Sequence, residues 1–388
     1  MPDAHSPHAP PAAHAATEPD EVAVPTLIGE RVRLRALTER DLDGITALAT
    51  DGDSVRWTTI PHPYPPDGAR EHLAATREQW RTGPAQGGPL CWAVETADHP
   101  FAGMIDVRPA PARWELGYAL HPAARGLRLM PDAIRLASGW AFGQGAQTVS
   151  AYVVRGNWAS RRVLWSCGFT VHPALPGWLP GRDGPPQDCW PATLPAGAPM
   201  TPAHRWTLAP RLAADGVALR PWRDDDVPRE EPDHPAHFMA APAPTAATFG
   251  DWLLDRREWV AAGRAVHWCV ADARTDEALG EVGLFTRAPS ELGDEAELGY
   301  QLFPGARGRG VMRTAARLAV DHAVSDLGFR RFTASCASDN AASAAVLRRL
   351  GFREWGREPA AHDLPGGGTA DEVHWELTRG GAAGTGSR

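Results

Sequence analysis

The clearest hydrophobic pattern lies in the second half of the chain, where three short segments change period one after another. Over residues 296–303 apolar and polar side chains alternate, with Leu298 and Leu302 on one face, which predicts a strand. Residues 304–310 are rich in glycine and predict a tight turn. Apolar positions then recur at helical spacing over residues 311–327. The pattern therefore predicts a strand that enters a glycine-rich turn and opens a helix.

Further short elements surround this unit. Residues 332–336 predict a strand, and residues 341–350 predict a helix that the following glycine ends as a left-handed cap. The first half of the chain shows the same order, with a strand at residues 149–153. Earlier strands are expected at residues 92–95 and 267–272. The predicted fold class is α/β, with a mixed (α+β) sheet in each half.

The chain repeats itself at an almost constant spacing. The tetrapeptide Glu-Leu-Gly-Tyr occupies residues 115–118 and again residues 297–300, 182 residues later. Asn157 recurs as Asn340, 183 residues later, and the Val-Leu and Gly-Phe pairs that follow recur at the same spacing. This period is far longer than the roughly 20–50 residues of a solenoid unit, so the repeat marks two whole domains.

The repeat sets the predicted domain organisation. The first domain spans residues 25–195, and the second, which has the better-formed turn, spans residues 213–380. Between them, residues 196–212 are rich in proline and glycine, as expected of a linker. Residues 1–24 and 381–388 are predicted to be disordered tails.

Charge and composition exclude several classes of chemistry. The net charge is −8, and all 39 basic residues are arginine. Without lysine there is no Schiff base, no phosphate-loop lysine, no lysine nucleophile and no self-acetylation on lysine. No basic stripe is present, so nucleic acid is not an expected partner. No apolar run reaches the roughly 18 residues of a membrane span, so a membrane is not expected either.

Cysteines and histidines indicate the compartment and exclude a metal centre. The five cysteines are scattered without a C-x-x-C pair, which argues against a disulfide framework or a zinc site and fits the reducing cytoplasm. His5, His8 and His14 offer weak metal ligands, but the composition around them favours an unstructured tail. No metal site is predicted.

The glycine-rich turn has both a chemical and a structural interpretation. A turn that opens a helix directs several main-chain N–H groups and the positive end of the helix dipole at one point, where they can hold a pyrophosphate. Arg307-Gly308-Arg309-Gly310 suits this role, but the segment is equally an ordinary tight turn. Neither the dinucleotide-binding fingerprint nor the P-loop pattern follows Tyr118 or Tyr300.

Taken together, the motifs resemble the GNAT acetyltransferase superfamily and, within it, the Rim-type branch that acetylates ribosomal-protein N-termini. The order Glu-Leu-Gly-Tyr, Arg-Gly-Arg-Gly-Val-Met, then Asn-x-x-Ser with Val-Leu and Gly-Phe carries the resemblance, as does an opening Leu-Arg followed by aspartate. It covers about residues 27–194 and 213–379. It implies two tandem GNAT-like acyl-CoA N-acyltransferase domains that use acetyl-CoA.

The resemblance also implies the cofactor site of the second domain. Main-chain N–H groups of the turn would bind the pyrophosphate of CoA, the strand end would pair with the pantetheine arm, and Asn340 would lie near the thioester. Met312 stands where the family has a small residue and is expected to crowd the loop. The implied cofactor-binding residues are Leu302, Phe303, Arg307, Gly308, Arg309, Gly310, Val311, Met312 and Asn340.

The first domain departs from this signature at one position. Arg128 stands where glycine is expected, so its side chain would block close approach of the cofactor or replace that approach with a charge. Because the requirement for a missing Cβ is steric, impaired binding is the favoured prediction. This copy would then be structural, regulatory or substrate-binding. Its equivalent residues are Glu115, Arg125, Gly126, Arg128, Met130, Asn157 and Ser160.

The catalytic residues predicted for the second domain are Glu297, Ser343 and Asn340. Glu297 is the candidate general base for the attacking amine, directly or through water; the alternative is a solvated acid. A main-chain N–H near Leu302 would meet charge on the thioester oxygen. Ser343 is the candidate proton donor to the leaving thiolate, and its alternative role is helix capping with Asn340. Tyr300 is predicted to be a packed strand residue.

The predicted function is acetyl transfer from acetyl-CoA to a primary amine, either a protein N-terminus or a small molecule. The negative charge favours a cationic acceptor. Two alternatives stay open: a non-catalytic acyl-CoA sensor or scaffold, and a tandem enzyme of small-molecule or thiol biosynthesis with one active copy. Acceptor pockets are expected near residues 61–70 and 232–248, with Trp57 or Trp252 as possible linings. The two copies are predicted to form an intramolecular pseudo-dimer.

Overall fold

The structure is a computed structural model of the 388-residue chain, and the chain divides into two compact units, Met1–Pro202 and Ala203–Arg388. The division lies within the predicted linker, while the predicted tails lie outside the described residues except for residue 24. The described residues are 24–84, 88–182, 184–228, 244–286, 295–364 and 367–379.

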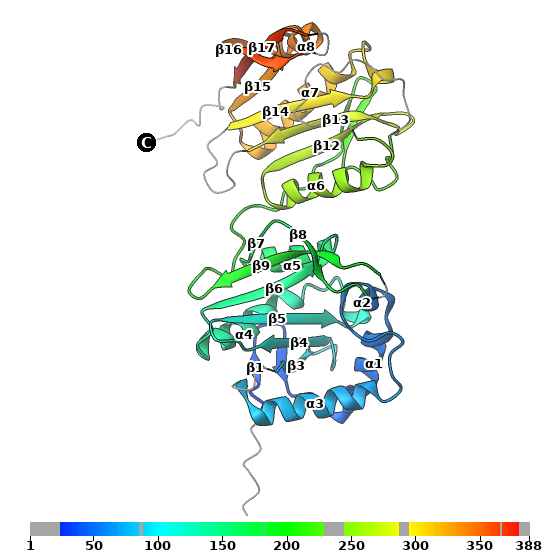
Figure 1. Ribbon diagram of the computed structural model, residues 1–388, viewed down its shortest axis with the longest axis vertical. Helices are drawn as coiled ribbons and strands as arrows, with labels where there is room; N and C mark the ends of the chain where they lie inside the picture. Colours follow the sequence, from blue (N-terminus) through cyan, green and yellow to red (C-terminus); the bar gives the residue numbers. More distant parts are fainter. Residues whose placement is uncertain are drawn as a thin grey trace, which may run out of the picture. The chain divides into compact units, whose positions relative to one another are not determined.

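The first domain contains one mixed sheet of nine strands in its described part (Figure 1). The strand order is β1-β2-β3-β4-β5-β6-β9-β7, with β8 also paired to β9, and only β5 and β6 run parallel. The strands are β1 (Leu27–Ile28), β2 (Arg33–Arg35), β3 (Leu90–Glu95), β4 (Gly103–Arg108), β5 (Arg113–Leu120), β6 (Thr148–Val154), β7 (Thr170–Val171), β8 (Leu175–Leu179) and β9 (Gln187–Pro195).

Helices cover both faces of this sheet. On one face α4 and α5 pack on the larger hydrophobic core, and on the other face α1 and α3 pack on a smaller core. The helices are η1 (Glu39–Asp41), α1 (Leu42–Thr50), α2 (Gly52–Trp57), α3 (Gly68–Thr82), η3 (Pro122–Ala124), α4 (Met130–Gly143) and α5 (Trp158–Ser166).

The second domain repeats this plan with an eight-stranded sheet in the order β10-β11-β12-β13-β14-β15-β17-β16. Its strands are β10 (Leu212–Ala214), β11 (Val217–Arg220), β12 (Ala265–Asp272), β13 (Ala278–Phe285), β14 (Glu295–Leu302), β15 (Arg331–Ala337), β16 (Arg353–Asp363) and β17 (Thr369–Thr378). Its helices are α6 (Phe249–Ala261), η4 (Pro304–Ala306), α7 (Val311–His322), the π-helical turn η5 (Ala323–Leu327) and α8 (Ala341–Leu350). The predicted helix at residues 311–327 thus ends in a π-helical turn, which the apolar spacing did not indicate.

One tryptophan anchors the centre of each core. Trp92 and Trp268 are both 0% exposed, and each donates its indole N–H to a proline carbonyl just before the first strand of its domain. These acceptors are Pro25, at 2.9 Å, and Pro210, at 3.0 Å. Because a buried N–H needs a partner, this bond fixes the same approach of the first strand in both copies.

A buried arginine also ties the start of each domain together. The Leu-Arg motif places Arg35 and Arg220 at the ends of β2 and β11, and each guanidinium makes a bidentate pair with an aspartate six residues later, Asp41 or Asp226. Burial acts to raise the pKa of Asp41, but the hydrogen bond from Arg35 lowers it on balance. The motif that the sequence showed as family-typical is therefore a structural clamp.

Acid should weaken the clamp around Arg220 in the second domain over a defined pH range. Burial acts to raise the pKa of Asp276, but hydrogen bonds from Arg211 and Arg223 and the charge of Arg220 bring it to about 2. The unfolded chain, with an aspartate pKa of about 3.9, then binds more protons than the folded one between these two values. The contribution to stability is complete above pH ~4 and is lost as the pH falls through ~2.

Urea unfolding at pH 6, 4 and 3 checks this expectation. We expect the midpoint of the wild-type chain to fall more steeply below pH 4 than that of Asp276→Asn. Asparagine suits the control because residue 276 has a φ of 61°, a left-handed conformation that asparagine tolerates. Equal pH slopes would contradict the assignment.

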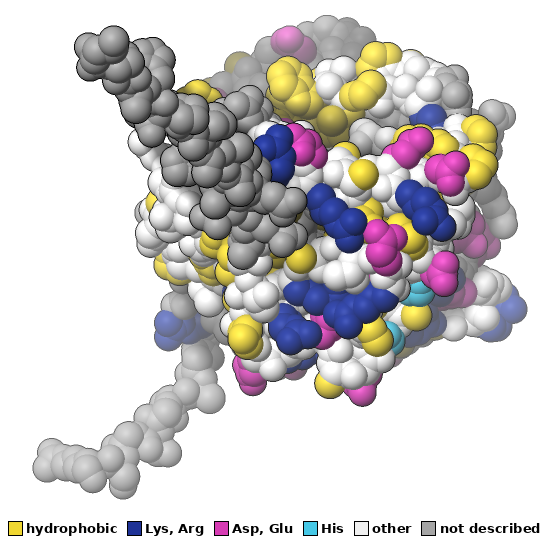
Figure 2. Space-filling view, turned by 90° about the horizontal axis from the view of Figure 1, so that it is seen from below, with side chains coloured by type: hydrophobic (Ala, Val, Ile, Leu, Met, Phe, Trp, Pro, Cys, Tyr) yellow, Lys and Arg dark blue, Asp and Glu magenta, His cyan; other side chains and the backbone are white. Residues whose placement is uncertain are grey.

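The surface of the first domain carries mixed charge. Figure 2 looks at the end of Figure 1 where α3 lies, and arginine side chains there lie among acidic ones. Arg77 pairs with Glu39 at 3.2 Å, and Arg81 pairs with Glu78 at 2.6 Å. These two arginines of α3 are therefore paired with acidic side chains. Within the described ranges, none of the helices combines the length and the apolar character that crossing a membrane requires.

Candidate active site

In both domains the two parallel strands separate after three residue pairs. Strands β14 and β15 are paired from Glu295 to Glu297, and β5 and β6 are paired up to Glu115 in the same way. Beyond these points β14 stays paired with β13 as far as Leu302, while its other edge is open among the described residues. An open strand edge offers main-chain N–H and C=O groups to an extended ligand.

The main-chain N–H and C=O groups along β14 point alternately to its two edges, and this decides which of them face the opening. Phe303 donates its N–H to Leu279 on the β13 side, at 2.9 Å, so that group is already used. Because pairing direction alternates along an antiparallel strand, the N–H groups of Leu302 and Tyr300 point to the open side. The Leu302 carbonyl accepts a hydrogen bond from the Arg307 Nε at 3.1 Å. Of the two predicted residues, Phe303 thus has its N–H already used within the sheet, whereas the Leu302 N–H faces the open edge; pairing of this edge with the pantetheine arm stays a prediction.

The turn after β14 forms a cradle of main-chain N–H groups. Gly308 and Gly310 have φ values of 73° and 78°, and Gly310 directly precedes α7. From Gly308 to Arg313, none of the N–H groups has a hydrogen-bond partner among the described residues. A Cβ added at either glycine would meet no atom within 4 Å, so the turn is open on that side. Such an array at a helix N-terminus suits a phosphate group.

The first domain builds the same turn with a different residue. Gly126 has a φ of 77°, and Arg128 takes a φ of 56°, close to that of Gly310. The arginine therefore adopts the left-handed conformation that the turn needs, at a cost of about 1–2 kcal/mol. Impaired cofactor binding stays a prediction for this domain, but a distorted turn is not its cause, since Arg128 keeps the left-handed conformation of Gly310.

Most of the signature arginines and methionines serve the loop itself. Besides Arg307, which holds the Leu302 carbonyl, Arg125 pairs with Asp51 and, at 3.2 Å, with Asp53 of α2. Met312 is 5% exposed and packs in the core, as Met130 does. The expectation that Met312 crowds the loop is therefore wrong, because its side chain points away from it. Only main-chain groups of these methionines, and of the buried Val311, are available to a ligand.

The equivalent glutamates of the two domains, Glu297 and Glu115, have different surroundings. Glu297 is exposed, lies on the last pair before the strands separate, and has no ion-pair partner among the described residues. Its neighbour on β13 is Phe285. In the first domain the corresponding neighbour is Arg108, whose Nη1 lies 2.6 Å from the Glu115 carboxylate. Glu115 therefore has a cationic partner, whereas Glu297 has none among the described residues.

Asn340 and Ser343 meet at the start of α8. The Asn340 Oδ1 accepts the Ser343 N–H at 3.0 Å and caps the helix, and Asn157 and Ser160 do the same in the first domain at 3.1 Å. Helix capping, the alternative role, is thus present in both copies. The predicted contact of Asn340 with the cofactor stays a prediction, since the Nδ2 of its side chain takes no part in the cap.

Tyr300 is a functional candidate that the sequence did not indicate. Its hydroxyl lies 2.8 Å from the Ser343 Oγ, and the residue belongs to the part of β14 beyond its last pair with β15. Burial raises the pKa of Tyr300, so the hydroxyl stays protonated at neutral pH. Alternation placed Tyr300 correctly on the core face, but its contact with a residue 43 positions later was not visible in the sequence.

A buried polar network lies behind the open edge of β14. The Glu281 carboxylate contacts the His267 Nε2 at 2.5 Å and accepts a hydrogen bond from the Gln301 Nε2 at 2.6 Å. Burial acts to raise the pKa of Glu281, but His267 and the charge of Arg256 lower it on balance. Trp252 of α6 packs on His267 with ring centroids 5.8 Å apart. The network keeps a charged carboxylate and fills the sheet face beside the site.

An open strand edge that leads into a main-chain anion cradle, on a mixed sheet built twice, is typical of the acyl-CoA N-acyltransferases. The comparison with known families agrees. The model of the acetyltransferase (GNAT) domain matches residues 31–170 and 217–353, and the chain belongs to this family, with two copies of its domain. Members of the family use acetyl-CoA.

Individual relatives match only part of the chain. "Probable N-acetyltransferase YjcK" of Bacillus subtilis is 34% identical over 104 residues, which is 27% of this chain and 57% of that protein. "Uncharacterized N-acetyltransferase YoaA" of the same organism is 29% identical over 24% of this chain and 51% of that protein. The chain therefore spans little more than half the length of these curated relatives.

Solved structures of single-domain size align with less than half of the chain. The ribosomal-protein-S5-alanine acetyltransferase from Vibrio fischeri is 22% identical over 44% of this chain and 96% of that one, with a TM-score of 0.38. Mycobacterium smegmatis RimJ in complex with CoA-disulfide is 20% identical over 42% of this chain and 81% of that one, with a TM-score of 0.35.

Proposed function

We propose that this protein is an acetyl-CoA-dependent N-acetyltransferase that acetylates a cationic primary amine at its second domain. The observation that carries the proposal is the position of Glu297, a carboxylate without an ion-pair partner in the described structure, at the point where β14 leaves β15. The cradle from Gly308 to Arg313 lies at the far end of the same open edge. A base and an anion site are thus placed along one extended ligand path.

The residues of the second domain have distinct roles in this mechanism. Acetyl-CoA supplies the activated acyl group as a thioester. Glu297 takes a proton from the ammonium group of the acceptor, directly or through water, so that the amine can form the new C–N bond. The Leu302 N–H, which points into the opening, donates to the carbonyl oxygen as charge develops there. As the C–S bond breaks, the hydroxyl pair of Tyr300 and Ser343 would protonate the leaving thiolate, and the second proton that the nitrogen loses on becoming an amide would restore the hydroxyl pair.

Acidic side chains on the open sheet face favour a cationic acceptor. Glu297 of β14, Thr333 of β15 and Glu376 of β17 lie directly opposite one another and share this face. Two strand positions further along β17, His374 and then Glu372 follow on the same face. The carboxylates of Glu372 and Glu358 lie within 4.8 Å of each other and of the His374 ring nitrogen. Arg331 offsets Glu376 at 3.4 Å, and the remaining negative charge of Glu297, Glu358 and Glu372 would attract an ammonium group.

The first domain is the better candidate for the non-catalytic copy. Its turn has the left-handed geometry, but its glutamate is held by Arg108 at 2.6 Å. The ion pair with Arg108 would have to open before this carboxylate could contact the ammonium group of an acceptor. We also place the protein in the cytoplasm, a proposal that the five free cysteines support.

Titration calorimetry with CoA tests the cofactor part of the proposal. We expect one tight site per chain, which Gly310→Arg weakens at least tenfold and Arg128→Gly leaves unchanged. Each turn has two left-handed positions. One of them is glycine in both domains, and the other is Gly310 in the second domain and Arg128 in the first, so the two variants exchange these residues. Full affinity in Gly310→Arg would show that the arginine side chain is harmless, and would remove the reason for preferring the second domain.

A further inference from the structure

Two glycines lie directly opposite one another in the sheet of the second domain and leave room for a single ring. They are Gly283 of β13 and Gly299 of β14. A Cβ added at Gly283 would come within 2.9 Å of the Phe285 Cζ, and one added at Gly299 would come within 2.8 Å of the Phe285 Cε2. Real Cβ atoms do not approach other carbons so closely, so a larger residue at either position would displace the ring. The ring of Phe285 therefore packs over a stretch of bare main chain.

This ring stands beside the proposed base. Phe285 and Glu297 are directly opposite one another on β13 and β14, so their Cβ atoms are about 4.5–5.5 Å apart. On the other side of Glu297, the opposite residue is Thr333 of β15. The Glu297 carboxylate thus has a large apolar neighbour on one side and a small polar neighbour on the other.

Helix α6 holds the ring from above the sheet. Trp259 of this helix contacts the ring of Phe285 edge to face, with the ring centroids 5.6 Å apart and an angle of 85° between the ring planes. The His267 Cδ2 also lies close to the glycine pair, 3.0 Å from the Cβ added at Gly283. Phe285 is therefore packed between the glycine pair and α6, which limits how far its ring can move when a ligand binds.

The ring also separates two carboxylates. Glu281, Gly283 and Phe285 occupy alternate positions of β13 and therefore share one face of the sheet. The buried Glu281, which contacts His267, lies on one side of the glycine pair, and the exposed Glu297 lies on the other. Because the ring covers the glycine pair, an ammonium group at Glu297 is kept away from Glu281.

The first domain arranges the same face of its sheet differently. Arg108 stands in the position of Phe285, and Asp106 stands in that of Gly283. The Arg108 Nε lies 3.1 Å from the Asp106 carboxylate. Ion pairs thus cover in the first domain what an aromatic ring covers in the second.

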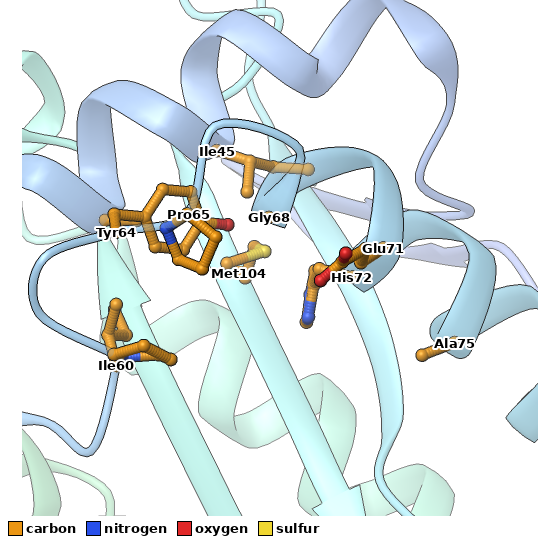
Figure 3. Close-up of a pocket in the computed structure, with 11 residues that line it drawn as sticks. Ile45, Ile60, Tyr64, Pro65, Gly68, Glu71, His72, Ala75 and Met104 are labelled. Atoms are coloured by element: carbon orange, nitrogen blue, oxygen red, sulfur yellow. The ribbon is translucent and has the colours of Figure 1, made fainter.

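Further along this face, the first domain has a cavity of about 350 Å³ (Figure 3). Met104 and the loop at residues 60–65, one of the stretches where an acceptor pocket was expected, contribute to its lining. In the second domain the position of Met104 is taken by Glu281, whose buried network fills the sheet face. The space available to a ligand therefore differs between the two copies, and in the second it ends at the ring of Phe285.

We propose that Phe285 determines which amines the second domain accepts, and that it selects amines carried on an unbranched carbon. An ammonium group at the Glu297 carboxylate has the Phe285 ring directly beside it. A second substituent on the carbon that bears the nitrogen would collide with this ring, which the glycine pair and Trp259 hold in place. Acetyl transfer to such an amine rests on the proposed function, whereas binding of the amine beside Glu297 is measured without it.

Calorimetric titration of the full chain, saturated with CoA, tests the proposal with two isomers, hexylamine and 2-aminohexane. CoA carries no acyl group, so no transfer occurs during the measurement. We expect the wild type to bind hexylamine about tenfold more tightly, the lower end of the discrimination that one methylene group provides in a packed pocket. Phe285→Ala removes the ring and should abolish this preference.

Two further variants separate this role from a loss of the fold. Phe285→Leu keeps an apolar side chain over the glycine pair and should lower the preference only in part. Phe101→Ala removes a ring that packs on a glycine of the first domain, Gly44, and should keep the preference of the wild type. Circular dichroism melting shows whether each variant folds.

The proposal would be overturned by equal affinity of the wild type for the two isomers, or by no detectable binding of either. An unchanged preference in folded Phe285→Ala and Phe285→Leu would overturn it as well. A preference for hexylamine that Phe285→Ala abolishes, without acetyl transfer from acetyl-CoA to hexylamine, would reject the proposed function and leave this role of Phe285 in place.

Discussion

Replacing Glu297 with glutamine should lower kcat/KM for acetyl transfer by about 10²–10⁴, the range that a general base contributes. Glutamine keeps the shape of the side chain but cannot accept a proton from the ammonium group. Because residue 297 lies at the opposite end of the open edge from the turn at Gly308, the affinity for CoA should stay within about twofold of the wild type. Steady-state release of free thiol with an amine panel, together with CoA calorimetry, measures both quantities.

Two matched variants make this result specific. Glu295 lies on the same face two residues earlier but is paired with Arg331 at 2.6 Å, so Glu295→Gln should have a small effect. Glu115→Gln, at the equivalent position of the first domain, should leave the rate unchanged because Arg108 already neutralises that carboxylate. A rate loss in Glu115→Gln as large as that in Glu297→Gln would place catalysis in both domains. No loss in Glu297→Gln would remove the proposed base.

Removing Asp226 should destabilise the second domain by about 3 kcal/mol, the lower end of the range for breaking a buried ion pair. Arg220 is 2% exposed, and the Asp226→Ala variant leaves its guanidinium without its bidentate partner. The effect stays at the lower end because Asp276 still contacts Arg220 through both its carboxylate and its carbonyl. The urea midpoint at pH 7, followed by tryptophan fluorescence, measures the change.

Asp224 provides the comparison for this stability experiment. Its side chain is 86% exposed and pairs with Arg257 at 2.7 Å, so Asp224→Ala should change stability by no more than about 0.5 kcal/mol. Both variants remove one aspartate from the same segment, and they differ in burial. Equal changes in the two would show that net charge, and not the buried clamp, decides the stability of this region.

Local patterns predicted the elements around the site closely. The helix predicted at residues 341–350 is α8, and Gly351 ends it with a φ of 92°, as a left-handed cap requires. The strand predicted at residues 296–303 is β14 within one residue at each end. These predictions depend on periodicity and on glycine conformation, which act within a few neighbouring residues.

Contacts between distant strands were not predictable in the same way. The pairing of Arg108 with Glu115 and the bond between Tyr300 and Ser343 depend on which strands lie side by side. Each of these residue types has an ordinary role at its own position, so the contact could not be predicted from the sequence. Arg128 shows a different limit. Its sequence position predicted a block to the close approach of a cofactor, which stays a prediction. That the arginine keeps the left-handed φ of the turn was not visible in the sequence, because the surrounding turn sets that conformation.

An anion site made of main-chain N–H groups also affects how the sequences of the two domain copies can diverge. Every residue except proline carries an N–H, so substitutions along the turn alter the side chains and leave the donors in place. After a duplication, such a site tolerates drift that would quickly destroy one built from lysine or histidine. Gly310 and Arg128 are the outcome of that tolerance: two descendants of one ancestral turn with the same path of the chain and different chemistry on its outer side.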